Sequence, residues 1–409
     1  MAKNDKKKSR VKPNKIAWCI YATVSYLFTV FQNKTRVNRK AFKKRNKNEG
    51  CLVMFNHGCK YDHFYASRAF GYTPVSYVVS THFCYNPFLR WAFGLVHAIP
   101  KEQFKADINA IMKIKRTLQS KTPVALSPAG QITMHGESVA IDKVIVKLFK
   151  MCNVDVYALQ MHGTYFAYPK WRKYRRHSPI RMEFVKVLSK EEIKTLTDEE
   201  IYQRACASID INDRLEQPKY NYKLKSKGLI EGLESIIYRC PSCKEKNSIT
   251  TSKDILSCDL CGYAVKMNSK GLLESAYDGE LLIDNESNWY RFEKEYIKEK
   301  IKKGDFFLDG KFDLYRDIDN DFKLDLVGSG RLVLTEEEFY YEGTLNGEVV
   351  RKDFNLKSLV QLPFESGRHF DIPDDEGYFE FKPALSELPS IVIEYVQAID
   401  VLASIRNEK

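Results

Sequence analysis

Two side chains near the start of the chain have the types and the spacing of a general base and its orienting acid. His57 and Asp62 follow the apolar run Cys51–Phe55 and are five positions apart. Within one continuous helix, five residues amount to about 500° of rotation, so two such side chains would point to different faces. Gly58 lies between them and adopts backbone angles that other residues avoid. We therefore expect a buried strand that ends before Asn56, a break at Gly58, and a helix whose first turn contains Asp62.

Such a pair has the chemistry of general base catalysis. A carboxylate fixes the tautomer of a histidine and stabilises its cation, while the other ring nitrogen takes a proton from a hydroxyl. The alternative interpretation is a structural histidine that a neighbouring acid satisfies. Spacing alone does not decide between them, because His369 and Asp374 are also five positions apart, in a stretch rich in Asp, Pro and Gly with no change from strand to helix.

The elements that must position this pair alternate in type between residues 50 and 190. Apolar runs predict strands at 52–55, 76–79, 96–99, 124–126, 154–159 and 181–187. Amphipathic stretches predict helices at 61–70, 87–93, 106–119 and 143–151. Such alternation is typical of an α/β domain in which helices cover a mostly parallel sheet.

The motifs of this region resemble those of the glycerolipid acyltransferase family, typified by enzymes that acylate 1-acyl-glycerol 3-phosphate. The first block of the family, Asn-His-x4-Asp, matches Asn56, His57 and Asp62, with Cys59 where serine is usual. The second block is similar to Gly94 and the sequence Ile-Pro-Lys that ends at Lys101, where arginine is common. The fourth block aligns with the strand at 154–159, without its proline.

The third block departs from the family pattern Phe-Pro-Glu-Gly-Thr-Arg. Here the sequence reads Ser127-Pro-Ala-Gly-Gln-Ile132. In the family the glutamate and the arginine are associated with the acceptor, the arginine with its phosphate, and neither Ala129 nor Ile132 replaces those groups. The acceptor therefore stays open, and lysophosphatidic acid is not the expected one. The resemblance implies a substrate site that contains Asn56, Cys59, Lys101, Pro128, Ala129, Gly130 and Gln131.

The resemblance also implies a reaction. His57 takes the proton of a lipid hydroxyl, which attacks the thioester of acyl-CoA or acyl-carrier protein, while Asp62 orients the ring. Backbone donors around Gly130 are expected to hold the oxyanion. No acyl-enzyme is required; an alternative route through a covalent intermediate on Cys59 is open on sequence grounds.

The amino-terminal region, residues 1–48, accounts for the net positive charge of the chain. It holds fifteen Lys or Arg and one acid, whereas the net charge of all 409 residues is +12, so the remainder is close to neutral. Between its two basic blocks, residues 16–31 are uncharged and aromatic-rich. This stretch is short for a spanning helix, which needs about 20 residues, and predicts a helix that lies on an anionic membrane surface, at its cytoplasmic face. The alternatives are a helix of the soluble core, or a nucleic-acid-binding arm.

A second basic run joins two predicted strands. It consists of Lys170, Arg172, Lys173, Arg175, Arg176 and His177. Such a run predicts either a surface that faces a lipid headgroup or the phosphates of coenzyme A, or a solvated turn.

Four of the ten cysteines have the spacing of a metal site. Cys240 and Cys243 form one Cys-x2-Cys knuckle, and Cys258 and Cys261 form a second, followed by Gly262. Two such knuckles predict a structural zinc ribbon, since four thiolates close the coordination shell. Disulfides are the competing interpretation, and the absence of a cleavable signal pattern favours a reducing compartment.

The remainder of the chain predicts a small β-rich domain. Strands are expected at 312–316, 322–327, 331–335, 338–342, 348–354, 359–362 and 378–381, with a final helix from about 389 to 404. The order of strands and helix resembles the pleckstrin-homology-like fold. The expected organisation is an arm and membrane helix (1–48), an acyltransferase-like domain (49–228), a zinc ribbon (229–271), a helical connector (272–304) and the β-rich domain (305–409).

Three functions follow from these features. The first is a membrane-associated acyltransferase that acts on a lysophospholipid or related glycerolipid. The second is a lipid-binding or scaffolding protein of the same fold without activity, which Ala129 and Ile132 favour. The third is a nucleic-acid-binding factor. The lack of a basic, aromatic face on the predicted ribbon argues against this third function. A protein partner for the ribbon or the C-terminal domain is a further expectation.

Overall fold

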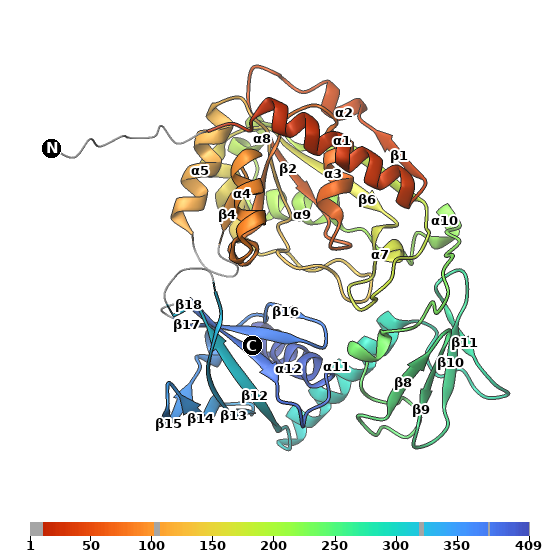
Figure 1. Cartoon of the computed structure of the whole chain (residues 1–409). Helices are drawn as coiled ribbons and strands as arrows, with labels where there is room; N and C mark the ends of the chain where they lie inside the picture. The colour runs from red at the N-terminus through yellow and green to blue at the C-terminus, as the bar shows by residue number, and fades with distance from the viewer. Residues whose placement is uncertain (1–10, 102–106, 319–322, 375–376, 409) are drawn as a thin grey trace. The chain divides into compact units, whose positions relative to one another are not determined.

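The computed structural model describes residues 11–101, 107–318, 323–374 and 377–408 (Figure 1). The basic residues Lys6, Lys7, Lys8 and Arg10, the predicted helix start at 106 and the predicted strand start at 322 lie outside these residues. The chain divides into two compact units. Unit 1 runs to Pro169 and from His177 to Tyr222, and unit 2 comprises Lys170–Arg176 and Lys223–Lys409.

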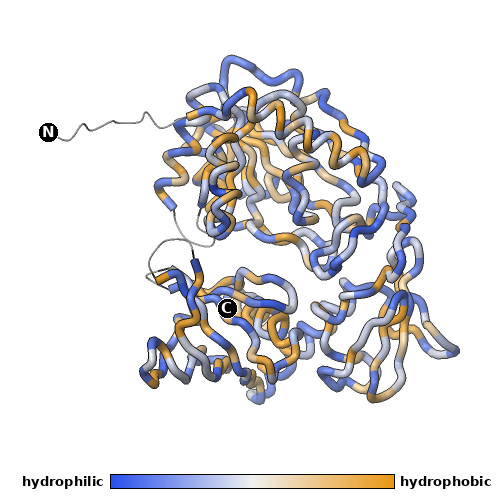
Figure 2. Tube along the Cα trace, in the orientation of Figure 1, coloured by the Kyte–Doolittle hydropathy of each residue, from blue (hydrophilic) through white to orange (hydrophobic). Residues whose placement is uncertain are grey.

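Unit 1 is built on a mixed, mostly parallel seven-stranded sheet of order β1-β7-β6-β2-β5-β3-β4. Neighbouring strands are parallel except β6 and β7. The strands are β1 (Thr35–Asn38), β2 (Leu52–Phe55), β3 (Ser76–Ser80), β4 (Ile99–Lys101), β5 (Val124–Leu126), β6 (Val156–His162) and β7 (Ile180–Leu188). The sheet confirms the predicted α/β class, and Figure 2 shows apolar residues in its central strands.

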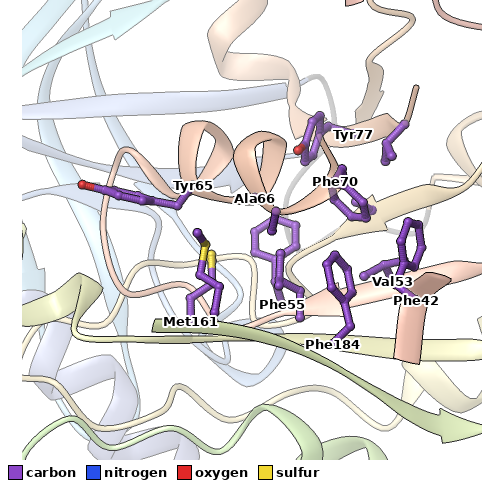
Figure 3. Close-up of a cluster of buried hydrophobic side chains, with 14 of the residues drawn as sticks. Phe42, Val53, Phe55, Tyr65, Ala66, Phe70, Tyr77, Met161 and Phe184 are labelled. Carbon is purple, nitrogen blue, oxygen red and sulfur yellow. The ribbon is translucent and has the colours of Figure 1, made fainter. Parts of the chain in front are cut away.

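Two helical layers enclose this sheet. The helices are α1 (Lys15–Gln32), α2 (Lys40–Lys43), α3 (Asp62–Phe70), α4 (Pro87–Leu95), α5 (Ile108–Gln119), α6 (Val144–Cys152), α7 (Thr164–Ala167), α8 (Lys190–Thr195), α9 (Asp198–Ile209) and α10 (Gln217–Tyr220). Alternate residues of β2 enter two cores. Val53 and Phe55 pack with residues of α1 to α3, as Figure 3 shows for part of this cluster. Leu52 and Met54 pack with residues of α5, α6, α8 and α9.

One predicted strand of unit 1 is displaced. The strand expected at 96–99 forms instead at Ile99–Lys101, because α4 continues to Leu95 and its last turn is closed by backbone bonds. The N–H of Val96 donates to Ala92, the N–H of Ala98 donates to Phe93, and His97 has a positive φ of 52°. Extended pairing therefore begins only at Ile99.

Helix α1 is docked on one side only. Trp18, Ala22, Ser25 and Thr29 are buried, and the Trp18 indole N–H donates to the carbonyl of Gly71 at 3.1 Å. The opposite side of α1 is apolar and exposed, and consists of Ile16, Ile20, Val24, Leu27 and Phe31. Across the described residues, the structure has no helix long and apolar enough to cross a membrane.

Unit 2 contains two antiparallel sheets. The smaller has the order β11-β10-β9-β8, and the larger has the order β15-β14-β13-β12-β18-β17-β16. The elements are β8 (Ile249–Ser252), β9 (Ile255–Cys258), β10 (Ala264–Met267), β11 (Leu273–Ser275), α11 (Glu286–Lys303), β12 (Leu308–Arg316), β13 (Asp325–Leu334), β14 (Phe339–Leu345), β15 (Glu348–Asp353), β16 (Phe364–Glu365), β17 (His369–Asp374), β18 (Gly377–Pro383) and α12 (Ile391–Glu408).

Two strand predictions of unit 2 are wrong. The strands expected at 322–327 and 331–335 are one continuous strand, β13. Residues 359–362 form no strand, since the chain makes a 3-10 turn at Leu356–Ser358 and the N–H of Leu359 donates back to the carbonyl of Leu356. The predicted final helix is present as α12 and begins at Ile391.

The basic run at 170–177 contains both exposed and buried side chains, since Lys173, Arg175 and His177 are exposed whereas two arginines are not. Arg172 and Arg176 are buried rather than solvated or turned toward a headgroup. Arg172 donates to the carbonyl of Gly228, and Arg176 donates to the carbonyl of Leu229 and lies 4.9 Å from the ring centre of Trp171. These side chains therefore hold Lys170–Arg176 within unit 2 through bonds to backbone carbonyls.

Candidate active site

The end of β2 is fixed before the chain reaches His57. Asn56 bonds to the backbone of Met161 in β6 twice, since its amide donates to the carbonyl and its oxygen accepts from the N–H, both at 2.8 Å. The carbonyl of His57 accepts from the N–H of Thr133 at 2.9 Å. These bonds to two other segments of unit 1 hold the backbone of His57 at the strand end.

Asp62, the first residue of α3, reaches back to the histidine. His57 Nδ1 and Asp62 Oδ2 are 2.8 Å apart. The carboxylate is almost fully buried, at 1% exposure, whereas the histidine side chain is 26% exposed. The same Oδ2 accepts from the N–H of Cys59 at 3.0 Å. A buried acid with several donors is held in one orientation, and the remaining ring nitrogen of His57, Nε2, is left for a proton transfer.

Cys59 supports the acid instead of lining the substrate site. Its side chain is fully buried, and its thiol donates to Asp62 Oδ1 at 3.2 Å. Burial and the neighbouring Asp62 carboxylate raise the pKa of Cys59 well above the usual range. Because the thiolate is the nucleophilic form, this environment opposes the covalent route considered from the sequence.

Gly58 is required by the closeness of a neighbouring segment. A Cβ atom at this position would lie 2.1 Å from the side-chain oxygen of Thr164, at the start of α7. Such a distance is far below van der Waals contact, so a larger residue fits only if Thr164 or its segment moves. The glycine that follows β2 also lets Thr164 approach the His57–Asp62 pair.

A small, partly open cavity lies beside the histidine. Its lining consists of Asn56, His57, Gly58, Ala129, Gln131, Thr133, Gly136, Ser138, Val139, Thr164, Tyr165, Ile209, Ile211 and Asp213. Of the residues expected from the sequence to bind substrate, Asn56, Ala129 and Gln131 are among them. The other four, Cys59, Lys101, Pro128 and Gly130, are not.

The expected oxyanion donor at Gly130 is already engaged. Gly130 has a positive φ of 68°, and its N–H donates to the carbonyl of Ser127 at 3.3 Å in a tight turn. That N–H therefore does not point at a substrate in this conformation. The third-block loop contributes the small side chain of Ala129 to the cavity, where the family has a glutamate.

Thr164 and Asp213 are among the lining residues that were not identified from the sequence. Asp213 is 3% exposed, and its Oδ1 accepts from the N–H of Gly163 at 2.6 Å. Burial raises the pKa of Asp213 to about 6. The only sequence signal was an acid in a polar connector, and nothing in its spacing related it to His57.

Unit 2 contains a second cluster with the chemistry of a site. The sulfur atoms of Cys240, Cys243, Cys258 and Cys261 lie within 4.8 Å of one another. Those of Cys240 and Cys261 are 3.6 Å apart, and those of Cys243 and Cys258 are 3.7 Å apart. A tetrahedral zinc ion with bonds of about 2.3 Å to sulfur requires about 3.8 Å between sulfurs, whereas a disulfide requires about 2.0 Å. The four cysteines therefore fit a tetrahedral metal ion.

Comparison with known proteins concerns the part of unit 1 that contains the first site. A family model described as Acyltransferase matches residues 31–162. This stretch carries an acyltransferase domain. The matched residues contain His57, Asp62, the third block and β6, whereas Asp213 lies beyond them.

A solved structure is also similar to part of the chain. It is PlsC, the 1-acyl-sn-glycerophosphate (LPA) acyltransferase from Thermotoga maritima. The two chains are 15% identical, the match covers 47% of this chain and 78% of that one, and the TM-score is 0.36. No curated protein matches the chain.

Proposed function

We propose that this protein transfers a fatty acyl group from a thioester donor, acyl-CoA or acyl-carrier protein, to a hydroxyl of a lysophospholipid or related glycerolipid. The observation that carries the proposal is the 2.8 Å contact between His57 and Asp62 at the wall of a cavity within an acyltransferase domain. A buried acid and a partly exposed imidazole are the arrangement that general base catalysis requires.

In this mechanism His57 Nε2 removes the proton of the acceptor hydroxyl as its oxygen attacks the thioester carbon. Asp62 holds the proton on Nδ1 and stabilises the imidazolium that forms. The tetrahedral intermediate then expels the thiolate, which takes the proton from His57. Acyl transfer is complete in one attack, so Cys59 is not needed as a nucleophile.

The acceptor is proposed to differ from lysophosphatidic acid. Ala129 lines the cavity and occupies the position of the family's glutamate. Ile132 occupies the position of the arginine that binds the acceptor phosphate in the family. An acceptor whose reacting hydroxyl is not next to a phosphate monoester fits this lining better.

Thioester consumption with a panel of lysolipids tests the function. We expect His57→Ala to lower kcat by about 10⁴-fold, because general base catalysis is lost. The matched control is His177→Ala, an exposed histidine of the same unit. Wild-type activity that survives in folded His57→Ala would overturn the mechanism, and lipid binding without transfer by the wild type would favour the scaffolding function.

We also propose that unit 1 binds a membrane surface through the exposed apolar side of α1, at the cytoplasmic face. Ile16, Ile20, Val24, Leu27 and Phe31 project from one side of an amphipathic helix, and Lys12, Lys15 and Lys34 lie at its ends. Apolar residues flanked by cations suit an anionic interface. We expect Ile20→Asp to weaken sedimentation with vesicles of anionic phospholipid, and Val349→Asp, an exposed site of unit 2, to leave it unchanged. Equal sedimentation of both variants would show that α1 does not form the membrane-binding surface.

Zinc is the proposed metal of the cysteine cluster, where it would stabilise unit 2. Cys240, Cys243, Cys258 and Cys261 would hold it, and the fourfold thiolate shell leaves no position for a substrate. Elemental analysis is expected to find one zinc per chain, lost in Cys258→Ser and kept in Cys152→Ser. Retention of zinc by Cys258→Ser would contradict this assignment.

A further inference from the structure

The side chain of Thr164 occupies an unusual position between the cavity and the catalytic turn. Thr164 lines the cavity that His57 also lines, and its hydroxyl oxygen is buried with no hydrogen-bond partner among the described residues. The same oxygen faces Gly58, the residue after the base, so closely that a methyl group on Gly58 would lie 2.1 Å from it. A buried hydroxyl without a partner costs free energy, and such groups are retained where a ligand supplies the partner.

The backbone around Thr164 is held by its two neighbours. Gly163 has a positive φ of 84°, and a Cβ atom there would lie 2.3 Å from the carbonyl of Pro179, so only glycine fits. Asp213 accepts from the N–H of Gly163 at 2.6 Å, and the N–H of Tyr165 also donates to it. A fully buried carboxylate therefore bonds to the residues on both sides of Thr164. The hydroxyl is carried by a rigid turn, as a preorganised donor requires.

Two backbone donors close to the cavity are occupied. The N–H of Gly130 donates to Ser127, and the N–H of Thr133 donates to the carbonyl of His57. Both belong to the loop that contains the third block. These two N–H groups are therefore not directed into the cavity.

We propose that Thr164 is the catalytic hydrogen-bond donor that stabilises the oxyanion of acyl transfer, and that Asp213 is the positioning residue for it. The proposal rests on the acyltransferase function proposed above. When the acceptor oxygen attacks, the carbonyl π bond breaks and its electron pair moves to the thioester oxygen, which accepts the Thr164 O–H. Rotation about the Cα–Cβ bond of Thr164, between staggered positions, directs the hydroxyl to that oxygen. When the carbonyl re-forms, the carbon–sulfur bond breaks, and the thiolate takes the proton that His57 removed from the acceptor.

Thr164→Val tests the donor, because valine keeps the shape of threonine and removes the hydroxyl. We expect kcat to fall by about 10²-fold to 10³-fold with little change in KM, since the bond strengthens in the transition state. The melting temperature is expected to be equal or higher, because the hydroxyl that is removed has no partner in the folded chain. Thr164→Ser is expected to recover most of kcat. An unchanged kcat in Thr164→Val, or an equal loss in Thr164→Ser accompanied by a lower melting temperature, would overturn the proposal.

A binding experiment separates this proposal from the acyltransferase function. A trifluoromethyl ketone analogue of acyl-CoA hydrates to a tetrahedral carbon whose oxygen resembles the oxyanion. Calorimetry is expected to show binding at least about tenfold weaker to Thr164→Val than to wild type and Thr164→Ser, equivalent to one lost hydrogen bond. Equal affinity for all three would exclude Thr164 as the donor even if His57→Ala proves inactive. Weaker binding to Thr164→Val together with unchanged turnover in His57→Ala would reject the general base and keep the oxygen-binding role.

Discussion

Two regions of this protein contain a histidine and an aspartate five positions apart, and they place them in opposite ways. In unit 1, Gly58 interrupts the chain between β2 and α3, and His57 and Asp62 meet at 2.8 Å. In unit 2 the corresponding residues are the first and last of one strand, β17 (His369–Asp374). There His369 lies 3.5 Å from Glu380, while Asp374 pairs with Arg316 and Lys352.

The difference shows which part of the motif carries the chemistry. Along a strand, residues five apart are separated by more than 15 Å and point to opposite faces, so they cannot form a pair. At a strand end followed by a glycine and a helix start, the chain turns back and the two side chains meet. The requirement is therefore the break at Gly58 and the helix that begins at Asp62, rather than the spacing.

The largest effect that separates these regions is expected from one substitution made in each. Asp62→Asn should lower kcat by about 10³-fold, because the amide no longer stabilises the imidazolium and favours the wrong tautomer, while the ring itself remains. Asp374→Asn should leave acyl transfer unchanged. The measurement is kcat with the best acceptor of the panel, on variants with native circular dichroism. Comparable losses in both variants would show that the unit 1 pair has no special role.

Much of the frame around the pair could be predicted from the sequence. The bounds of β2 and β5 follow from short apolar runs closed by polar residues or glycine, and both strands form where those runs lie. The strand β1 (Thr35–Asn38) was missed, since its four residues have no apolar period and it is fixed by pairing with β7, far along the chain.

The residues that complete the site could not be predicted, because tertiary contacts alone relate them to the pair. Asp213 lies about 150 positions after His57 and is recognised only by its burial and its bond to Gly163. The burial of Arg172 and Arg176 could not be predicted from the sequence either. A run of cations indicates solvent, and only the carbonyls of a distant segment make their burial possible.

The second prediction concerns Asp213, an acid that lies outside the Asn-His-x4-Asp motif. Burial raises the pKa of Asp213 from an ordinary value of 3.8 to about 6, so the folded chain binds this proton more tightly than the unfolded chain. The stability that the protonated form provides is present below about pH 4 and is lost as pH rises through about 6, a change of about 3 kcal/mol. Asp213→Asn, which cannot ionise, should lack this loss between pH 4 and 6. Denaturant unfolding across that window measures it, and equal slopes in both proteins would contradict the assignment.

The smallest effect tests the break itself by adding one methyl group. Gly58→Ala places a Cβ atom 2.1 Å from the Thr164 oxygen, so the Thr164 side chain must rotate, or the turn after β2 or α7 must move. Overpacking of this kind costs about 1 to 3 kcal/mol, and we expect that loss in the free energy of unfolding together with a lower kcat. The control is Gly94→Ala in α4, where a Cβ atom meets nothing within 4 Å and alanine favours the helix by about 0.5 to 1 kcal/mol. If Gly58→Ala were as stable and as active as Gly94→Ala, the close approach of Thr164 to the base would not exist in solution, and the contrast between the two histidine–aspartate regions would rest on the helix start alone.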